Sequence, residues 1–269
     1  MRSHALVLEK AQMNIEDFSK SYSDVFQETV RRASRDLGDE LFSKISVPQL
    51  SYVTNEYRVA PVKVLVMGQE TYGVYDTLRG DLDKGEDWYE ERLRKGKNEF
   101  SAFNFAVGTE VENSPFWRGY QDVVSAFDLP GRSSVAWSNI VKVQLTEFTK
   151  GSFSITVLSP EDRVKVVRWQ RELAIAELEY LKPDVLIMFT GGLTWVAKHI
   201  YATGDRPVRQ HQIADLPASS GHMDAAPLDG VVSVFTYHPA ALRKAEDKAI
   251  VSEHRRRVIE WAKNKVESS

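Results

Sequence analysis

The 269-residue chain contains no cysteine. This absence excludes disulfide bonds, cysteine-ligated zinc, iron–sulfur clusters and thiol nucleophiles. Any chemistry must therefore use histidine, carboxylates, hydroxyl groups, or a metal ion held by oxygen and nitrogen ligands.

Long hydrophobic runs and an excess of one charge are also missing. No window approaches about 18 consecutive apolar residues, and the first residues contain no extended apolar segment, so we expect no secretion signal, no membrane span and, by default, a cytoplasmic protein. The 35 Lys and Arg residues stand against 38 Asp and Glu residues, giving a net charge of −3. The chain is therefore not the uniformly basic body of a protein that coats nucleic acid, and any contact with DNA must come from a local patch.

The composition is that of an ordinary globular protein, with 42% hydrophobic and 27% charged residues. We expect one domain over residues 1–269 with two additional segments. The first is an N-terminal helical extension over residues 1–55, predicted because residues 15–45 have apolar positions at three- and four-residue steps. The second, residues 74–100, is dense in charges of both signs and is expected to be an exposed, partly helical insertion.

Apolar runs that end at polar or glycine-containing segments predict the main strands of a sheet. These runs cover residues 62–68, 134–141, 184–190 and 231–236. Helical spacing covers residues 161–181 and 244–265, and the long connection at 203–230 is expected to be a binding loop. This alternation predicts an α/β fold with a mostly parallel central sheet, helices on both faces and a ligand crevice at the carboxyl ends of the strands.

Polar motifs follow the first and the last of these strands. The first motif reads Gly-Gln-Glu-Thr-Tyr-Gly over residues 68–73, and the second reads Tyr-His-Pro-Ala-Ala-Leu over residues 237–242. Because the carboxyl ends of parallel strands meet at one edge of a sheet, we expect Glu70 and His238 to face the same crevice.

These segments resemble the first and last motifs of the uracil-DNA glycosylase superfamily, which read Gly-Gln-Asp-Pro-Tyr-His and His-Pro-Ser-Pro-Leu in its uracil-excising branch. Between them, residues 103–107 resemble the family's base-stacking segment, residues 114–118 the Pro- and Ser-rich segment after it, and residues 137–142 the strand that ends in a base-reading Asn. The resemblance spans roughly residues 60–245. It implies a three-layer sandwich and a monofunctional, monomeric DNA glycosylase that works without a cofactor or metal.

The resemblance gives the catalytic roles to Glu70 and His238. Such an enzyme flips a pyrimidine nucleotide out of the DNA and hydrolyses the bond between base and sugar, leaving an abasic site. Glu70 would stabilise the positive charge on the sugar and position the attacking water, and His238 would donate a hydrogen bond to the departing base. In the alternative interpretation, Glu70 is a loop carboxylate that caps a helix N-terminus.

The same resemblance implies a pocket for the base. Phe105 would stack on the base and Asn139 would read its polar edge, while Gln69 and Tyr72 would complete the pocket, Tyr72 by crowding the C5 position. Alternatively, Phe105 is a core residue and Asn139 a turn former. Uracil is the default base, and a modified phage base or a damaged base is the main alternative because residues 74–100 could reshape the pocket beside Tyr72.

Contacts with DNA are expected after the last motif. Leu242 matches the apolar wedge that fills the gap left by the flipped nucleotide, and Arg243 and Lys244 would contact phosphates. Arg residues at 255–257 could add phosphate contacts or simply form a solvated helix face.

The sequence also departs from the family motifs. Glu70 stands where the first motif has Asp, which adds one methylene group, and Thr71 stands where it has Pro. Ala240 and Ala241 replace the Ser and Pro of the last motif. These departures leave open a second hypothesis, a catalytically inactive member of the same fold that binds nucleic acid or a nucleotide.

Overall fold

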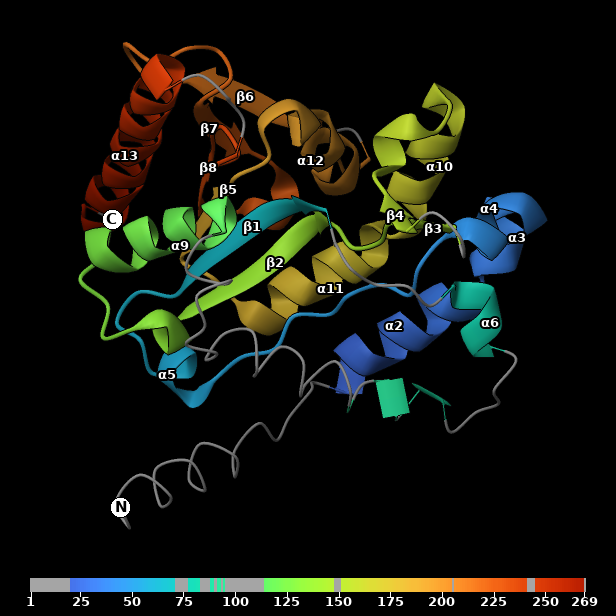
Figure 1. Ribbon diagram of the computed structural model, residues 1–269. Coiled ribbons are helices and arrows are strands. Elements are labelled where there is room, and N and C mark those ends of the chain that lie inside the picture. Colours follow the sequence, from blue (N-terminus) through green and yellow to red (C-terminus); the bar gives the residue numbers. More distant parts are fainter. Residues whose placement is uncertain are drawn as a thin grey trace, which may run out of the picture.

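A six-stranded sheet forms the centre of the molecule, in the order β2-β1-β5-β8-β7-β6 (Figure 1). The computed structural model describes residues 20–70, 77–82, 88–89, 91–92, 94, 114–147, 151–204, 206–240 and 245–268. The four predicted strands are confirmed as β1 (Val64–Glu70), β2 (Val135–Val141), β5 (Val185–Met188) and β8 (Val232–Phe235). All neighbouring pairs among these four are parallel, so their carboxyl ends lie at one edge.

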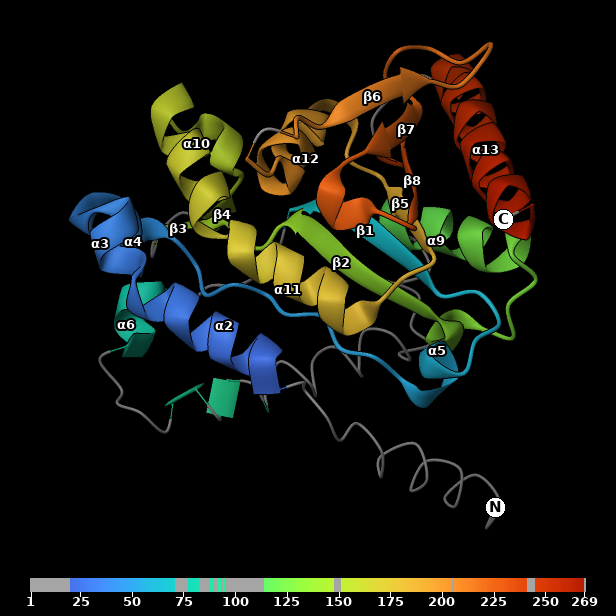
Figure 2. The same cartoon turned by 180° about the vertical axis from the view of Figure 1, so that it is seen from behind.

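Helices cover both faces of this sheet, as predicted (Figures 1 and 2). The helices are α2 (Lys20–Arg31), α3 (Ala33–Leu37), α4 (Asp39–Lys44), α5 (Asn55–Arg58), α6 (Leu78–Leu82), α9 (Pro115–Ala126), α10 (Pro160–Trp169), α11 (Arg171–Leu181), α12 (Thr194–Tyr201) and α13 (Ala245–Glu267). The helical spacing predicted over 161–181 is divided into α10 and α11 at Gln170, and the predicted closing helix corresponds to α13. Among the described residues, no helix combines the length and apolar content needed to cross a bilayer.

Two further strands lie where the sequence predicted a long binding loop at 203–230. β6 (Arg209–Gln212) and β7 (Gly221–Asp224) pair antiparallel and extend the sheet beyond β8. The loop prediction is wrong here because β6 reads Arg-Gln-His-Gln and lies largely exposed at the sheet edge. An edge strand of this kind lacks the apolar alternation by which a strand is recognised in a sequence.

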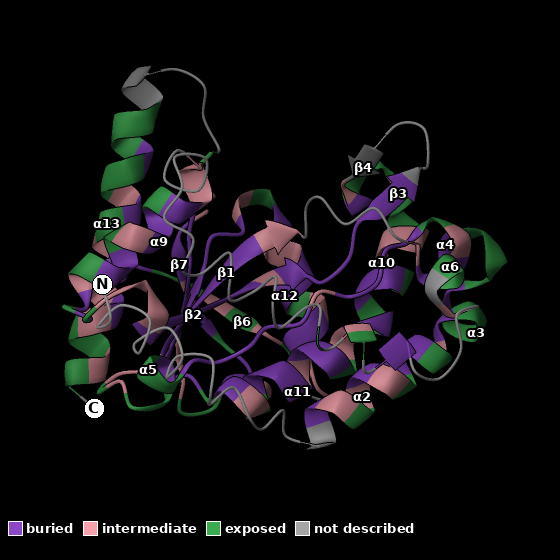
Figure 3. Cartoon of the chain, turned by 60° about the horizontal axis from the view of Figure 1, so that its bottom comes forward, coloured by how far each residue is buried: buried purple, intermediate pink, exposed green. Residues whose placement is uncertain are grey.

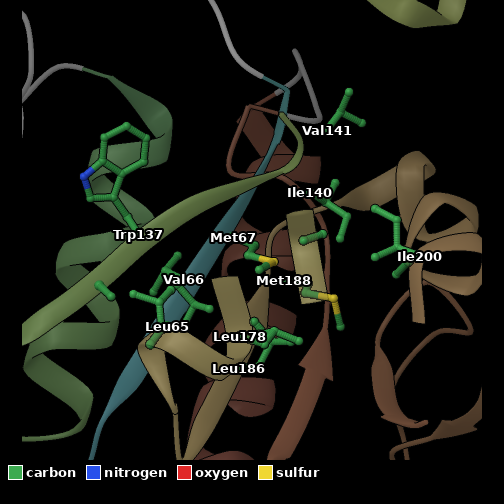
Figure 4. Close-up of a cluster of buried hydrophobic side chains, with 14 of the residues drawn as sticks. Leu65, Val66, Met67, Trp137, Ile140, Val141, Leu178, Leu186, Met188 and Ile200 are labelled. Atoms are coloured by element: carbon green, nitrogen blue, oxygen red, sulfur yellow. The ribbon is translucent and has the colours of Figure 1, made fainter. Parts of the chain in front are cut away.

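The hydrophobic core is continuous between the sheet and its helices (Figure 3). Side chains of β1, β2 and β5 meet Leu178 of α11 and Ile200 of α12, whereas Trp137 points to the opposite face, toward α9 (Figure 4). Residues alternate between the faces because a strand has a period of two. The two faces of β2 therefore have different partners, and only one of them carries Asn139.

Parts of the two additional segments belong to this core. α2 packs against α11, with Tyr22 and Phe26 fully buried. Within 74–100, Leu78, Trp88 and Tyr89 are buried, and the Trp88 ring lies 6.4 Å from that of Phe26. The expected exposure is therefore wrong for these three residues, because isolated apolar residues in a charged stretch give no periodic signal.

A short two-stranded sheet and four 3-10 turns complete the described elements. The strands are β3 (Leu145–Glu147) and β4 (Gly151–Phe153), and the turns are η1 (Arg132–Ser134), η2 (Ile155–Val157), η3 (Gly191–Leu193) and η4 (Ala226–Leu228). Of these, η2 and η3 lie next to residues that the sequence assigned to the site.

A buried ion pair connects β2 to the helices behind it. Lys142, the residue after β2, pairs with Glu177 of α11, and both side chains are almost completely shielded from solvent. Ser138 Oγ donates to Glu177 Oε2 at 2.8 Å, and Tyr22 Oη donates to Glu177 Oε1 at 3.1 Å. Burial lowers the pKa of Lys142, and the Glu177 carboxylate opposes that shift. Each buried charge therefore depends on the other for compensation.

Lys142→Met should lower the free energy of unfolding by about 3–5 kcal/mol, because it leaves the Glu177 carboxylate buried without its counter-ion. Urea unfolding monitored by tryptophan fluorescence measures the loss. The double variant Lys142→Met, Glu177→Gln should be more stable than Lys142→Met alone, since no uncompensated charge remains. A single variant as stable as the wild type would contradict this role of the pair.

Candidate functional site

The carboxyl ends of the parallel strands bring together four residues that the sequence assigned to the site. Gln69 and Glu70 end β1, Asn139 lies in β2 as the neighbour of Gly68, and His238 follows β8. They come from segments up to 169 positions apart in sequence, and the parallel sheet is what places them at one edge.

Gly191, the first residue of η3 after β5, is where Gln69 and His238 approach each other. A methyl group at this glycine would lie 3.4 Å from Gln69 Nε2 and 3.4 Å from the backbone nitrogen of His238. Its φ of +50° lies in the left-handed region, which glycine adopts without strain. Gln69 Nε2 donates to the carbonyl of Thr190 at 2.9 Å, so the β5 end also fixes the Gln69 amide.

The contacts of His238 favour one neutral form of its imidazole. Nδ1 accepts a hydrogen bond from the backbone N–H of Ala240 at 3.2 Å, which leaves the ring proton on Nε2. Burial lowers the pKa of His238, and the positive charge of Arg255 lowers it further. The imidazole is therefore a neutral Nε2–H donor at neutral pH.

Helix α9 packs directly on the His238 segment. The Phe116 ring is inclined by 17° to the imidazole, with the ring centroids 6.4 Å apart. One turn further along α9, a methyl group at Gly119 would lie 2.6 Å from Pro239 Cγ. Only a residue without a side chain permits this approach, so α9 and the segment after β8 hold each other in place.

Glu70 is a half-buried carboxylate with two donors. Ser154 Oγ donates to Glu70 Oε1 at 2.8 Å, and the backbone N–H of Ile155, the first residue of η2, also donates to the carboxylate. Burial raises the pKa of Glu70, and these two hydrogen bonds oppose the shift because they stabilise the charged form. Glu70 thus accepts a backbone hydrogen bond at the start of η2, as the alternative of a capping carboxylate expected. The same contacts fix the position of the Glu70 carboxylate.

Asn139 lies within β2, so the turn-former alternative is wrong. Its Oδ1 faces β1, because a methyl group at Gly68 would lie 2.6 Å from Oδ1. The same methyl group would lie 3.1 Å from Phe116 Cε2. Its Nδ2 faces the other way and donates to Gln49 Oε1 at 3.2 Å. Asn139 and Phe116 therefore meet over a glycine that leaves space for both.

Three of these neighbours were not predicted as site residues. Phe116 follows Ser114-Pro115, a helix-start signal that identifies the beginning of α9 but not the face on which its side chains lie. Gln49 and Ser154 reach their partners across 90 and 84 positions of the chain, so no local pattern could have indicated them.

Five predicted site residues, Tyr72, Phe105, Leu242, Arg243 and Lys244, lie outside the described residues. Within the described part of the chain, no cluster of three or more His, Asp or Glu side chains could hold a metal ion.

The arginines at 255–257 bind acceptors within the chain. Arg255 pairs with Asp122 of α9 at 2.9 Å, Arg256 pairs with glutamates on its own helix, and Arg257 donates to the carbonyl of Asp215. These contacts favour a structural role for the three arginines over contact with phosphate.

No protein-family model matches the chain, and no curated protein matches it either.

Gly68→Ala should displace the Asn139 amide and the Phe116 ring, because the new methyl group would lie 2.6 Å from Asn139 Oδ1. Overpacking of this kind costs about 1–3 kcal/mol of stability. Urea unfolding measures the cost, and the side-chain amide resonances of Asn139 report the displacement. Gly131→Ala is the control, since a methyl group there meets no described atom within 4 Å. Unchanged Asn139 resonances in Gly68→Ala would rule out the close contact.

Proposed function

We propose that this chain is a monofunctional DNA glycosylase, which hydrolyses the N-glycosidic bond of a flipped-out pyrimidine nucleotide and leaves an abasic site in DNA. The observation that carries the proposal is the placement of a half-buried carboxylate, an amide and a neutral imidazole at one edge of the sheet, on Glu70, Asn139 and His238. These are the groups that the reaction needs at the sugar, at the base edge and at the leaving group.

His238 suits the leaving-group end of the reaction. Negative charge collects on a carbonyl oxygen of the base as the bond breaks, and a donor aimed at that oxygen contributes about 3–4 kcal/mol. A neutral Nε2–H donor serves this purpose without a protonation step. The backbone N–H of Ala240 supports the role because it keeps the proton on Nε2.

Glu70 suits the sugar end. A carboxylate stabilises the cation-like sugar by charge, and the attraction is stronger where the surroundings exclude water. It can also accept a proton from the attacking water. The hydrogen bonds from Ser154 and Ile155 favour the charged form of the carboxylate and fix its position. Such positioning matters because Glu70 is one methylene longer than the family's Asp.

Asn139 and Phe116 suit the base itself. The amide of Asn139 can pair with the polar edge of a pyrimidine, and an aromatic face beside it can stack on the ring. Uracil is the default substrate, and a modified or damaged base is the alternative.

Glu70→Gln and His238→Ala should each lower the excision rate by about 100-fold or more, because each removes a group that acts only in the transition state. The assay incubates protein with oligonucleotides that carry uracil or bulky modified cytosines, and alkali then cleaves the strand at abasic sites. His211→Ala, in the exposed strand β6, is the control and should cut at the wild-type rate. Unchanged cutting in both site variants would falsify the mechanism, and no cutting by the wild type on a broad panel of bases would favour the inactive nucleic-acid-binding member.

The pH dependence of excision should show an acid limb set by Glu70. The reaction needs the charged carboxylate, and burial raises the pKa of Glu70, so activity should fall at a higher pH than for an ordinary glutamate. Ser154→Ala removes a hydrogen bond that lowers this pKa, so it should move the limb to still higher pH. Single-turnover rates against pH measure the shift. Ser159→Ala, whose hydroxyl contacts Asp162 in α10, should leave the limb in place, and an equal shift in both variants would argue against Ser154.

A further inference from the structure

We infer that Gln49 determines which pyrimidine the proposed site accepts, because it fixes the direction in which the Asn139 amide points. The inference rests on the proposed function, since it concerns the base that the glycosylase would bind. Gln49 itself belongs to none of the motifs that suggested this function.

Gln49 lies on the outer side of β2. β2 is an edge strand whose sheet neighbour is β1, and the segment at 46–51 runs along its other side. Ser51 Oγ donates to the carbonyl of Trp137 at 2.8 Å, and the backbone N–H of Gln49 donates to the carbonyl of Lys142 at 2.8 Å. The end of β2 thus holds the Gln49 backbone in place beside Asn139.

This position gives the Asn139 amide a defined direction. Nδ2 donates outward to Gln49 Oε1 at 3.2 Å, and Oδ1 lies on the inner side, over Gly68 of β1. Turning the Asn139 amide alone would place Oδ1 against Gln49 Oε1, and two acceptors in contact repel each other. With Gln49 Oε1 facing Asn139, the contact favours the amide with its acceptor toward the centre of the sheet edge.

The direction matters because the two ends of an amide have opposite hydrogen-bonding character. A 4-oxo pyrimidine presents a donor at N3 and an acceptor at position 4, whereas a 4-amino pyrimidine presents an acceptor at N3 and a donor at position 4. An amide held one way matches one of these edges and opposes the other.

The sheet order shows which edge is matched. His238 follows β8, and β5 and β1 lie between it and Asn139 on β2. With His238 on the base carbonyl at position 2, N3 and then position 4 follow in the direction of β2. Oδ1 is on the His238 side and meets N3, and Nδ2 meets position 4. The described orientation thus fits a base with an N3 proton and a 4-oxo group, and it opposes a 4-amino base.

The test measures binding to bases that cannot be excised. Oligonucleotides carry one 2′-fluoro-arabino analogue of deoxyuridine or of deoxycytidine, whose glycosidic bond resists cleavage, and fluorescence anisotropy at fixed salt gives the two affinities. The wild type should bind the deoxyuridine analogue about tenfold more tightly, as expected for one correctly paired base edge. Gln49→Glu, which can only accept, should keep this ratio. Gln49→Met, similar in shape but without the acceptor, should bring the ratio close to one.

A substitution of the same kind elsewhere in the sheet serves as the control. Gln210→Met in β6 carries the same substitution away from β2 and should keep the wild-type ratio. Equal affinities in the wild type, a preference for the deoxycytidine analogue, or a wild-type ratio in Gln49→Met would overturn the inference about Gln49.

A parallel excision assay with natural deoxyuridine and the same broad panel of bases separates this inference from the proposed function. A ratio that depends on Gln49 without any excision would support base reading and overturn the glycosylase proposal. Excision together with an affinity ratio that is the same in the wild type and in Gln49→Met would support the glycosylase proposal and overturn the inference about Gln49. No binding to either analogue would overturn both the glycosylase proposal and this inference.

Discussion

Gly68 and Asn139 are direct neighbours on two parallel strands, and the missing side chain at Gly68 is what lets the Asn139 amide and the Phe116 ring come together there. Two further contacts of the site start from this point. Phe116 carries the contact to His238, and Asn139 carries it to Gln49 on the outer side of β2. A side chain at this position would separate the Asn139 amide from the aromatic ring. The space left by one glycine therefore permits the close approach of Asn139 and Phe116.

β2 also separates the site from a second polar system. Trp137 and Asn139 face α9, whereas Ser138 and Lys142 face the buried carboxylate of Glu177 in α11. The alternation of a strand makes this separation possible, because successive side chains leave opposite faces. One face thus holds the compensated charge pair of Lys142 and Glu177, while the other carries the Asn139 amide proposed to read the base.

Burial acts on the two proposed catalytic groups in opposite directions, since it disfavours whichever form is charged. It raises the pKa of Glu70 and lowers that of His238, so both neutral forms gain. For His238 the neutral form is the useful one. For Glu70 the charged form is needed, and the donors on Ser154 and Ile155 supply the opposing stabilisation. The proposed reaction thus depends on a segment beyond β4 that lies far from Glu70 in the sequence.

The sequence by itself determined the four parallel strands, because each is a short apolar run that is stable only when it is buried. With the strands it also determined the edge of the sheet at which Glu70, Asn139 and His238 lie. It did not determine the polar edge strand β6, the burial of Trp88, or the division between α10 and α11, since none of these follows from periodicity. Tertiary structure alone decided the partners of the site residues. Gln49 and Ser154 contact Asn139 and Glu70 across 90 and 84 positions. Such contacts arise when the whole chain packs, and a local pattern records only which face of an element is apolar.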